Sequence, residues 1–208
     1  MNKRRPPGAV TLSKLLSLAG ALLGLVLLTG AVSPASASAS APAASASAAS
    51  ASAAAVRAVR TIRYDASGSA EFQADVDEGA RIWNERVQSV QFTPGTPADV
   101  VVYADDGWPR TQPAGLGRGT VWMGRQAVQE GHYPPRIAAH ELGHILGLPD
   151  DRTGLCEDLM SGASAGTGCR NPNPNPAEIA EVEANFQNGV ARVAAGALLT
   201  EEPAAARR

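Results

Sequence analysis

The sequence predicts an α/β domain in which helices pack on a mixed, twisted sheet. Short strand-like segments alternate along the chain with longer segments of helical period. One predicted helix carries the string His-Glu-x-x-His, and a further helix follows a long loop near the C-terminus. The chain shows no internal repeat.

The first elements come from two different periodicities. Residues 61–64 alternate between apolar and polar side chains, which indicates a strand. Residues 69–87 show a helical period, and Ser69 is a candidate N-terminal cap. The apolar positions that define this period are Phe72, Val76, Ala80, Trp83 and Val87.

Three more strands are expected before the second helix, over residues 90–92, 100–103 and 118–122. Val100 to Val102 is a continuous apolar run, which favours a strand buried on both faces. The last of the three is expected at a sheet edge. Asp105-Asp106-Gly107 is predicted to form a turn.

The second helix is predicted over residues 136–146, because Pro134 and Pro135 fit its first turn and Gly147 fits the position just after its end. A Gly-, Ser- and Pro-rich loop follows over residues 153–176. The last helix, residues 177–187, places Ile179, Val182 and Phe186 on one side.

Residues 1–37 are predicted to be a signal peptide, so the protein is expected to be secreted and extracellular. Lys3, Arg4 and Arg5 precede an apolar run over residues 9–32, and Ala35-Ser36-Ala37 is one possible cleavage site. A membrane anchor is the rival interpretation, because the run is near the minimum length of about 18 residues. The small residues behind it, without a positive flank, favour cleavage and no stable membrane association afterwards. The arginine pair fits an ordinary n-region better than a twin-arginine signal.

The remaining chain divides by composition. Residues 38–59 are mostly Ala and Ser and are expected to be a disordered leader or pro-segment, because they offer few large apolar groups. Residues 60–190 are assigned to the folded domain and residues 191–208 to a flexible tail. The net charge of −2 and the absence of a basic stripe exclude a nucleic-acid partner. A monomer is the default expectation.

His140, Glu141 and His144 predict a metal centre. Four residues apart on a helix, the two imidazoles share a face and can reach one metal ion. Glu141 stands beside the first ligand, where its carboxylate serves as a general base. Gly147 turns the chain after the helix, so that Asp150 returns as a third ligand and one position stays open for water. Zinc in such a site acidifies its water and polarises a carbonyl.

Two other residues compete for the role of third ligand. Asp151 lies beside Asp150, although the spacing favours Asp150. His132, the third histidine of the chain, would have to reach the metal from the loop before the helix. A cap or solvent position for Asp151 and a solvent-side position for His132 are the simpler interpretations.

The string H-E-x-x-H-x-x-G-x-x-D resembles that of the snapalysins, small extracellular neutral proteases of the metzincin clan. Leu159-Met160-Ser161-Gly162 is similar to the Met-turn of that family, and Cys156 and Cys169 match its single disulfide. Two cysteines behind a secretion signal also indicate one disulfide by themselves. Trp83-Asn84 and the sequence from Asn171 to Pro174 extend the resemblance over the whole presumed domain.

The resemblance implies a metzincin-like zinc protease domain divided by a cleft, with Met160 beneath the metal as a supporting residue. It also implies that residues 117–124 form the edge strand that binds substrate by strand addition. The family prefers an aromatic residue just after the cleaved bond, which requires an apolar pocket near the metal.

This sequence departs from the family pattern at two places. Where the family binds calcium, Tyr133 and Pro135 replace the ligands, so calcium is not expected there. The remaining candidate oxygen ligands are Asp105, Asp106 and Asp158. Arg152 replaces a tyrosine that serves the developing oxyanion, and it is either a substitute donor or a surface residue.

The sequence therefore predicts a secreted zinc endopeptidase that acts on protein or peptide substrates. Two alternatives remain open, namely a non-catalytic zinc-binding module and a zinc hydrolase of a small amide. Glu141 argues against the first alternative, because metal binding alone does not require it.

Overall fold

A computed structural model describes residues 58–202. Nearly all of the predicted signal peptide and leader, residues 1–37 and 38–59, lies outside the described residues. Within the described part, no helix is both long and apolar enough to cross a membrane.

The domain is built on a mixed sheet, as the sequence predicted, but the sheet has six strands and two of them, β4 and β6, were not predicted. The strands follow the order β2-β1-β3-β5-β4-β6 across the sheet. The first four positions in this order pair in parallel, whereas β4 runs antiparallel to both β5 and β6. Their bounds are β1 Arg60–Gly68, β2 Val90–Pro94, β3 Val100–Asp105, β4 Arg110–Gly115, β5 Arg118–Gly124 and β6 Leu199–Thr200.

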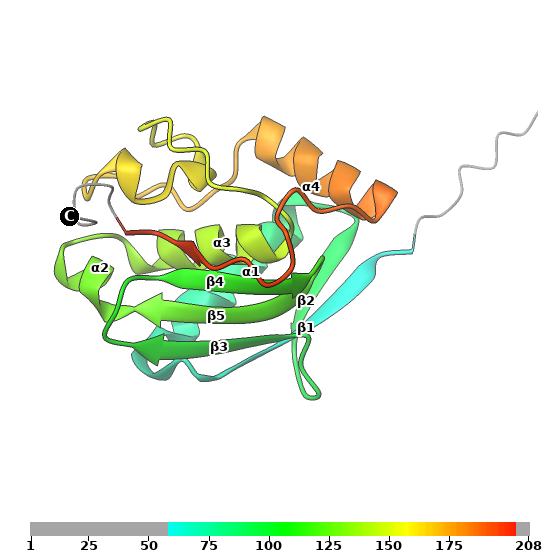
Figure 1. The fold of residues 1–208 in the computed structure, drawn as a ribbon, viewed down its shortest axis with the longest axis horizontal. Coiled ribbons are helices and arrows are strands. Elements are labelled where there is room, and N and C mark those ends of the chain that lie inside the picture. The colour runs from blue at the N-terminus through cyan, green and yellow to red at the C-terminus, as the bar shows by residue number, and fades with distance from the viewer. Residues whose placement is uncertain (1–57, 203–208) are drawn as a thin grey trace, which may run out of the picture. The chain divides into compact units, whose positions relative to one another are not determined.

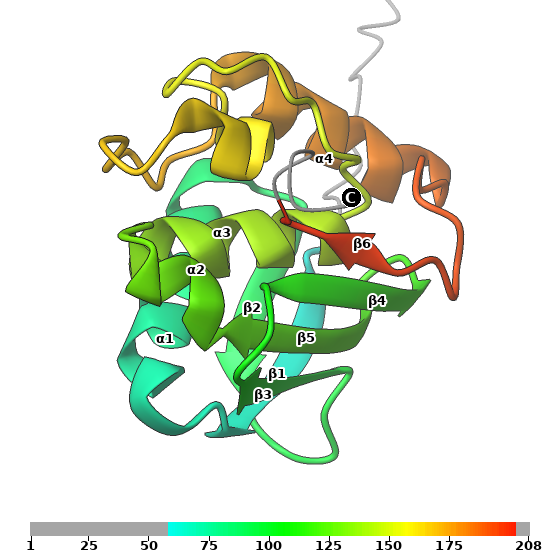
Figure 2. The same cartoon turned by 60° about the vertical axis from the view of Figure 1, so that its left-hand side comes forward.

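Two long helices, α1 (Gln73–Arg86) and α3 (Pro134–Ile145), pack against each other on one face of this sheet (Figures 1 and 2). Their contact is close at Gly79, where an added Cβ would lie 2.9 Å from the backbone nitrogen of Ala139. The indole Nε1 of Trp83 donates to the carbonyl of Ala139 at 2.8 Å, so the two helices are also joined by a buried hydrogen bond. This packing fixes the helix that carries the His-Glu-x-x-His string.

The remaining helices are shorter, except for the last one. The short helices are η1 (Ala70–Phe72), α2 (Arg125–Gln129) and η2 (Leu159–Ala165), and the last helix is α4 (Pro176–Asn188). Helix α3 begins at Pro134, and α4 begins after an Asn175 cap whose side chain accepts from two backbone amides. In Figure 2, η2 and α4 lie on the side of α3 away from the sheet.

Several local expectations differ from the structure. Ser69 does not cap a helix, because its hydroxyl donates to the carbonyl of Ala66 at 2.6 Å. Val101 is only partly buried while its two neighbours are fully buried, so β3 alternates after all. Strand β5 is interior, because β4 pairs with its outer side. Residues 191–202, expected in a flexible tail, include β6, which pairs with β4.

Candidate metal centre

Two histidines on one turn of α3 face the same point. The rings of His140 and His144 stand nearly perpendicular, with centroids 4.6 Å apart, and both side chains are 1% exposed. The Nδ1 of His140 lies 2.9 Å from the carbonyl of Leu159, and that of His144 lies 2.8 Å from the carbonyl of Leu148. A carbonyl only accepts, so each Nδ1 is the donor, and in the neutral ring each Nε2 keeps a free lone pair.

The chain after α3 returns to these histidines through a tight cap. Gly147 has φ +90°, its N–H donates to the carbonyl of His144, and the N–H of Leu148 donates to that of Gly143. These two bonds are the Schellman pattern, which favours glycine at this position. The predicted end of the helix is thereby confirmed, and the reversal leads directly to Asp150.

Asp150 completes a triangle of donor atoms. Its Oδ1 lies 3.4 Å from Nε2 of His140 and 3.6 Å from Nε2 of His144. Two ligands of one tetrahedral zinc are separated by roughly 3.4 Å, since each bond is about 2.0–2.2 Å long. These two spacings therefore fit a zinc ion, and the buried Oδ1 has no hydrogen-bond partner among the described residues.

The other carboxylate oxygen of Asp150 contacts Arg152. The guanidinium Nη2 lies 3.2 Å from Oδ2 and also donates to the carbonyl of Thr200 at 2.9 Å. Burial raises the pKa of Asp150, but the contact with the His140 imidazole and the nearby positive charges outweigh burial and hold the pKa well below its usual range. Arg152 is thus tied to the cluster and is not an isolated surface residue.

The competing ligand candidates lie elsewhere. The exposed Asp151 uses its backbone N–H on the carbonyl of Met160, and its carboxylate does not belong to the cluster. His132 packs edge-on against Trp108, with ring centroids 5.8 Å apart. Neither side chain therefore reaches the position that His140 and His144 face.

Glu141 is fully buried and held by a hydroxyl group. The Oγ1 of Thr111 on β4 donates to its Oε2 at 2.6 Å, while Oε1 has no partner among the described residues. Burial, reinforced by the negative charge of Glu201 and opposed by His140, raises the pKa of Glu141 to about 8. A buried carboxylate with one oxygen fixed and one free is well arranged to exchange a proton.

A fourth residue joins the centre from the C-terminal segment. The residue Glu201 is 5% exposed, and its Oε1 lies 2.5 Å from Nε2 of His140. One donor atom from each of His140, His144, Asp150 and Glu201 falls within 4.8 Å of the others. Imidazole and carboxylate groups are the usual nitrogen and oxygen ligands of zinc, so the types of donor fit that ion. The 2.5 Å between Oε1 of Glu201 and Nε2 of His140 is a hydrogen-bond distance, shorter than the roughly 3.4 Å between two zinc ligands, so without metal this carboxylate contacts the imidazole directly.

The two imidazoles differ in their electrostatics. Burial, together with the charge of His140, lowers the pKa of His144 to about 4. Burial also disfavours the charged form of His140, but the carboxylates of Glu201 and Asp150 outweigh it and raise its pKa well above the usual value. The carboxylates around the two rings thus favour a positive charge at this point, which a proton or a metal ion supplies.

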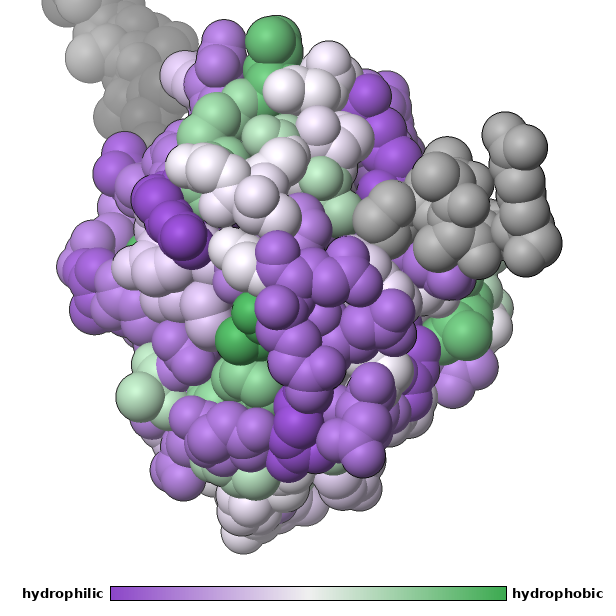
Figure 3. Space-filling model, turned by 90° about the vertical axis from the view of Figure 1, so that its left-hand side faces the viewer, coloured by the Kyte–Doolittle hydropathy of each residue, from purple (hydrophilic) through white to green (hydrophobic). Residues whose placement is uncertain are grey.

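An apolar pocket adjoins His140. Its walls come from the loop before β4, from α2, from the start of α3 and from η2, and they include Trp108, Ala127, Ile137 and Ala163. Glu201 also lines it. Figure 3 looks onto this end of the molecule, where small apolar areas are set among hydrophilic side chains. An apolar side chain bound here would lie directly beside the cluster.

Met160 packs against α3 at Gly143, and its place beneath a metal, which the resemblance implied, stays a prediction. Its side chain is 2% exposed, and a Cβ added at Gly143 would lie 2.7 Å from its sulfur. The same Cβ would come within 3.3 Å of the ring of Trp83. Glycine between the two histidines therefore lets the methionine approach the backbone of α3.

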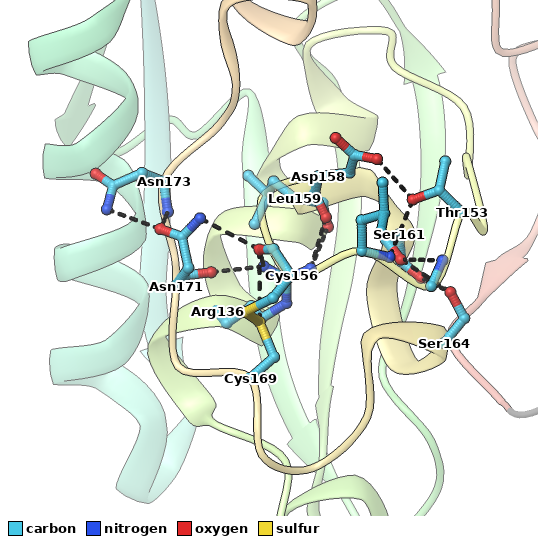
Figure 4. Close-up of a disulfide and its surroundings, with 12 residues drawn as sticks. Arg136, Thr153, Cys156, Asp158, Leu159, Ser161, Ser164, Cys169, Asn171 and Asn173 are labelled. Atoms are coloured by element: carbon cyan, nitrogen blue, oxygen red, sulfur yellow. Dashed lines mark hydrogen bonds between the residues drawn. A yellow bond between two sulfur atoms is a disulfide. The ribbon is translucent and has the colours of Figure 1, made fainter.

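The segment around η2 is closed by a disulfide and is held to α3 by hydrogen bonds. Cys156 and Cys169 form the predicted disulfide. Beside it, the buried guanidinium of Arg136 donates to the carbonyls of Cys156, Asn171 and Asp158, the last at 2.6 Å (Figure 4). The carbonyl of Leu159, which orients His140, lies in the same segment. These bonds connect the position of the imidazole to the loop beneath it.

The three aspartates considered for calcium are engaged separately. Asp105 forms an ion pair with Arg110, and Asp106 lies 3.0 Å from Arg125. Asp158 accepts from Thr153 at 2.6 Å and from Asn175 at 2.8 Å. The structure does not bring the three carboxylates together.

Comparisons with known proteins place the described part of the chain in a protease family. A model of the Streptomyces extracellular neutral proteinase (M7) family matches residues 58–189. The extracellular small neutral protease of Streptomyces caespitosus is 40% identical over 62% of this chain and 98% of its own length. That of Streptomyces sp. strain C5 is 37% identical over 64% of this chain and 59% of its own length. A match to the solved structure of high choriolytic enzyme 1, a hatching enzyme zinc-protease from Oryzias latipes, covers 47% of this chain and 50% of that one, with 21% identity and a TM-score of 0.34.

Proposed function

Since the chain belongs to the Streptomyces extracellular neutral proteinase (M7) family, as its resemblance to the snapalysins predicted, we propose that it is a secreted zinc-dependent endopeptidase. The observation that carries the zinc assignment is the convergence of His140, His144 and Asp150 on one buried point. Their spacing and their orienting hydrogen bonds support a catalytic metal. When bound, zinc would polarise the scissile carbonyl and make a water molecule more acidic.

Glu141 is the proposed general base. Thr111 fixes Oε2, so Oε1 is the atom that accepts a proton from the attacking water and delivers it to the leaving amine. Arg152 holds the second oxygen of Asp150 and thereby orients that ligand. This contact favours a positioning role for the guanidinium over direct contact with the developing oxyanion.

We further propose that the pocket beside His140 receives the side chain that follows the cleaved bond. Trp108, Ala127 and Ile137 give it apolar walls, which suit an apolar side chain. Its free volume is about 20 Å³ with Glu201 among the lining residues, so a large side chain requires that lining to move. The exposed main-chain groups of an extended peptide would pair with an edge of the sheet. Proteins or peptides are therefore the proposed substrates, and a small amide would leave this edge unused.

A secreted, non-catalytic zinc-binding module is the second candidate. The observation that favours it is Glu201, because a fourth protein ligand is typical of structural zinc sites. Glu141 favours the enzyme, since a buried carboxylate with a free oxygen serves no purpose in binding metal alone.

The test is hydrolysis of casein by the protein collected from culture medium, with its metal content measured in parallel. We expect about one zinc per chain, loss of hydrolysis with phenanthroline and recovery with added zinc. Hydrolysis that continues unchanged in a protein freed of metal would contradict the proposal.

A further inference from the structure

The C-terminal segment follows the outer edge of β4. The N–H of Gly196 donates to the carbonyl of Pro113 at 2.6 Å, and that of Glu201 donates to the carbonyl of Pro109 at 3.0 Å. Between them, Leu199 pairs with Thr111 and Thr200 pairs with Arg110, antiparallel. Figure 2 shows β6 beside β4 at the end of the sheet nearest α3. Without this segment β4 would be an edge strand, open to an extended peptide.

The edge of β4 is also the edge next to the reactive groups. Thr111 on this strand holds the carboxylate of Glu141, so an extended chain on β4 passes the cluster. The family resemblance placed the substrate strand at residues 117–124, but β5 is covered by β4 on its outer side. The segment from Gly196 to Glu201 therefore takes the place where a substrate would add to the sheet.

Glu201 is seated in the cluster by contacts on both carboxylate oxygens. Oε2 accepts from the N–H of Ala163 at 2.7 Å, while Oε1 points at Nε2 of His140. A Cβ added at Gly162 would lie 2.3 Å from Oε2, so the glycine leaves room for this carboxylate. Arg152 lies 3.9 Å from Oε1 and binds the carbonyl of Thr200. A buried carboxylate is costly unless a positive partner compensates it.

We propose that Glu201 is a fourth metal ligand and that residues 196–202 form an internal inhibitor. A catalytic zinc needs three protein ligands and one position for water or substrate, whereas four protein ligands close the site. Glu201 takes the open position, and β6 takes the substrate edge at the same time. While this segment lies on β4, the secreted chain hydrolyses its substrate more slowly than it does once the segment has left. This inference rests on the proposed function, since it takes the cluster to be a catalytic zinc site.

The experiment compares the full-length secreted chain with Glu201→Ala and with Leu199→Pro. The proline removes a main-chain donor from the strand that carries Glu201, so it frees the segment without altering the carboxylate. Glu202→Ala is the matched control, because this neighbouring carboxylate is outside the cluster. Zinc content and far-ultraviolet circular dichroism are measured for every variant. Each chain is then titrated calorimetrically with a peptide hydroxamate, and its rate of casein hydrolysis is measured.

We expect both segment variants to keep zinc, to bind the hydroxamate and to hydrolyse casein at least about tenfold faster than the wild type, because a tethered segment competes at a high effective concentration. The wild type and Glu202→Ala should both bind the hydroxamate at least about tenfold more weakly. With cobalt in place of zinc, the hydroxamate should change the visible spectrum of Glu201→Ala but not that of the wild type.

Two further outcomes separate this inference from the proposed function. Equal hydroxamate affinity in the wild type and Glu201→Ala, with equal hydrolysis, would overturn the inhibitor and leave the endopeptidase standing. Hydroxamate binding restricted to the segment variants, with no hydrolysis by any chain, would support Glu201 as the closing ligand and overturn the endopeptidase.

Discussion

At the scale of single residues, parts of the site are packed so closely that a larger side chain does not fit. Gly143 is one such position, because an added Cβ would meet the sulfur of Met160 at 2.7 Å. It also lies between the two histidines along α3. A change there should therefore disturb both stability and metal binding.

We expect Gly143→Ala to lower the free energy of unfolding by about 1–3 kcal/mol, the usual cost of overpacking a core. Zinc affinity should fall with it. Gly168→Ala is the control, since no atom lies within 4 Å of a Cβ built at that residue. Urea unfolding and zinc titration check both variants, and equal stability of the two would contradict the proposed contact between Met160 and α3.

The local part of the site could be predicted from the sequence, and the non-local part could not. His140, Glu141, His144 and Asp150 lie within eleven consecutive positions, so helical spacing and a glycine turn were enough to bring the four close together. Thr111 and Glu201 arrive through strand pairing across the sheet. A single threonine and one carboxylate in a Glu-Glu-Pro string carry no periodic signal that could have identified them.

At the scale of elements, the segment around η2 determines how His140 is oriented. The disulfide, Arg136 and the carbonyl of Leu159 all belong to this connection between α3 and the loop beneath it. The metal site should therefore respond to changes made on the far side of the loop.

We expect removal of the disulfide in a Cys156→Ala, Cys169→Ala double variant to cost about 3 kcal/mol by the chain-entropy relation for a loop of this length. The same variant should release zinc faster to a chromogenic chelator, because the carbonyl that orients His140 becomes less constrained. Unchanged zinc release in a destabilised variant would show that the loop stabilises the fold without positioning the ligand.

Strands β4 and β6 were not predicted, because neither shows the apolar alternation that is typical of a strand. Strand β4 contains Pro113 and ends at Gly115, two residues that are unfavourable in most strands, and it survives because it pairs on both sides. Strand β6 has only two residues, too few for a periodic pattern. The longer elements with clear apolar periodicity, such as α1 and α3, were predicted to within a few residues at each end.

At the scale of the whole molecule, the cluster joins α3, the loop after it and the C-terminal segment. A metal ion held by these parts stabilises the folded state over the unfolded one, because the unfolded chain offers no preformed site. We expect removal of zinc with a chelator to lower the melting temperature by on the order of ten degrees. Differential scanning calorimetry with and without the chelator measures this, and coincident transitions would contradict a metal bound by His140, His144 and Asp150.

The most direct test of the central claim compares Glu201→Ala with the double variant Glu141→Gln, Glu201→Ala in casein hydrolysis and zinc content. The Glu201→Ala background leaves the fourth position open in both proteins. We predict equal zinc in the two, with hydrolysis reduced by about a hundredfold or more in the double variant, since general-base catalysis contributes roughly 10²–10⁴-fold. Equal rates of hydrolysis would show that Glu141 is not the base and would contradict the mechanism.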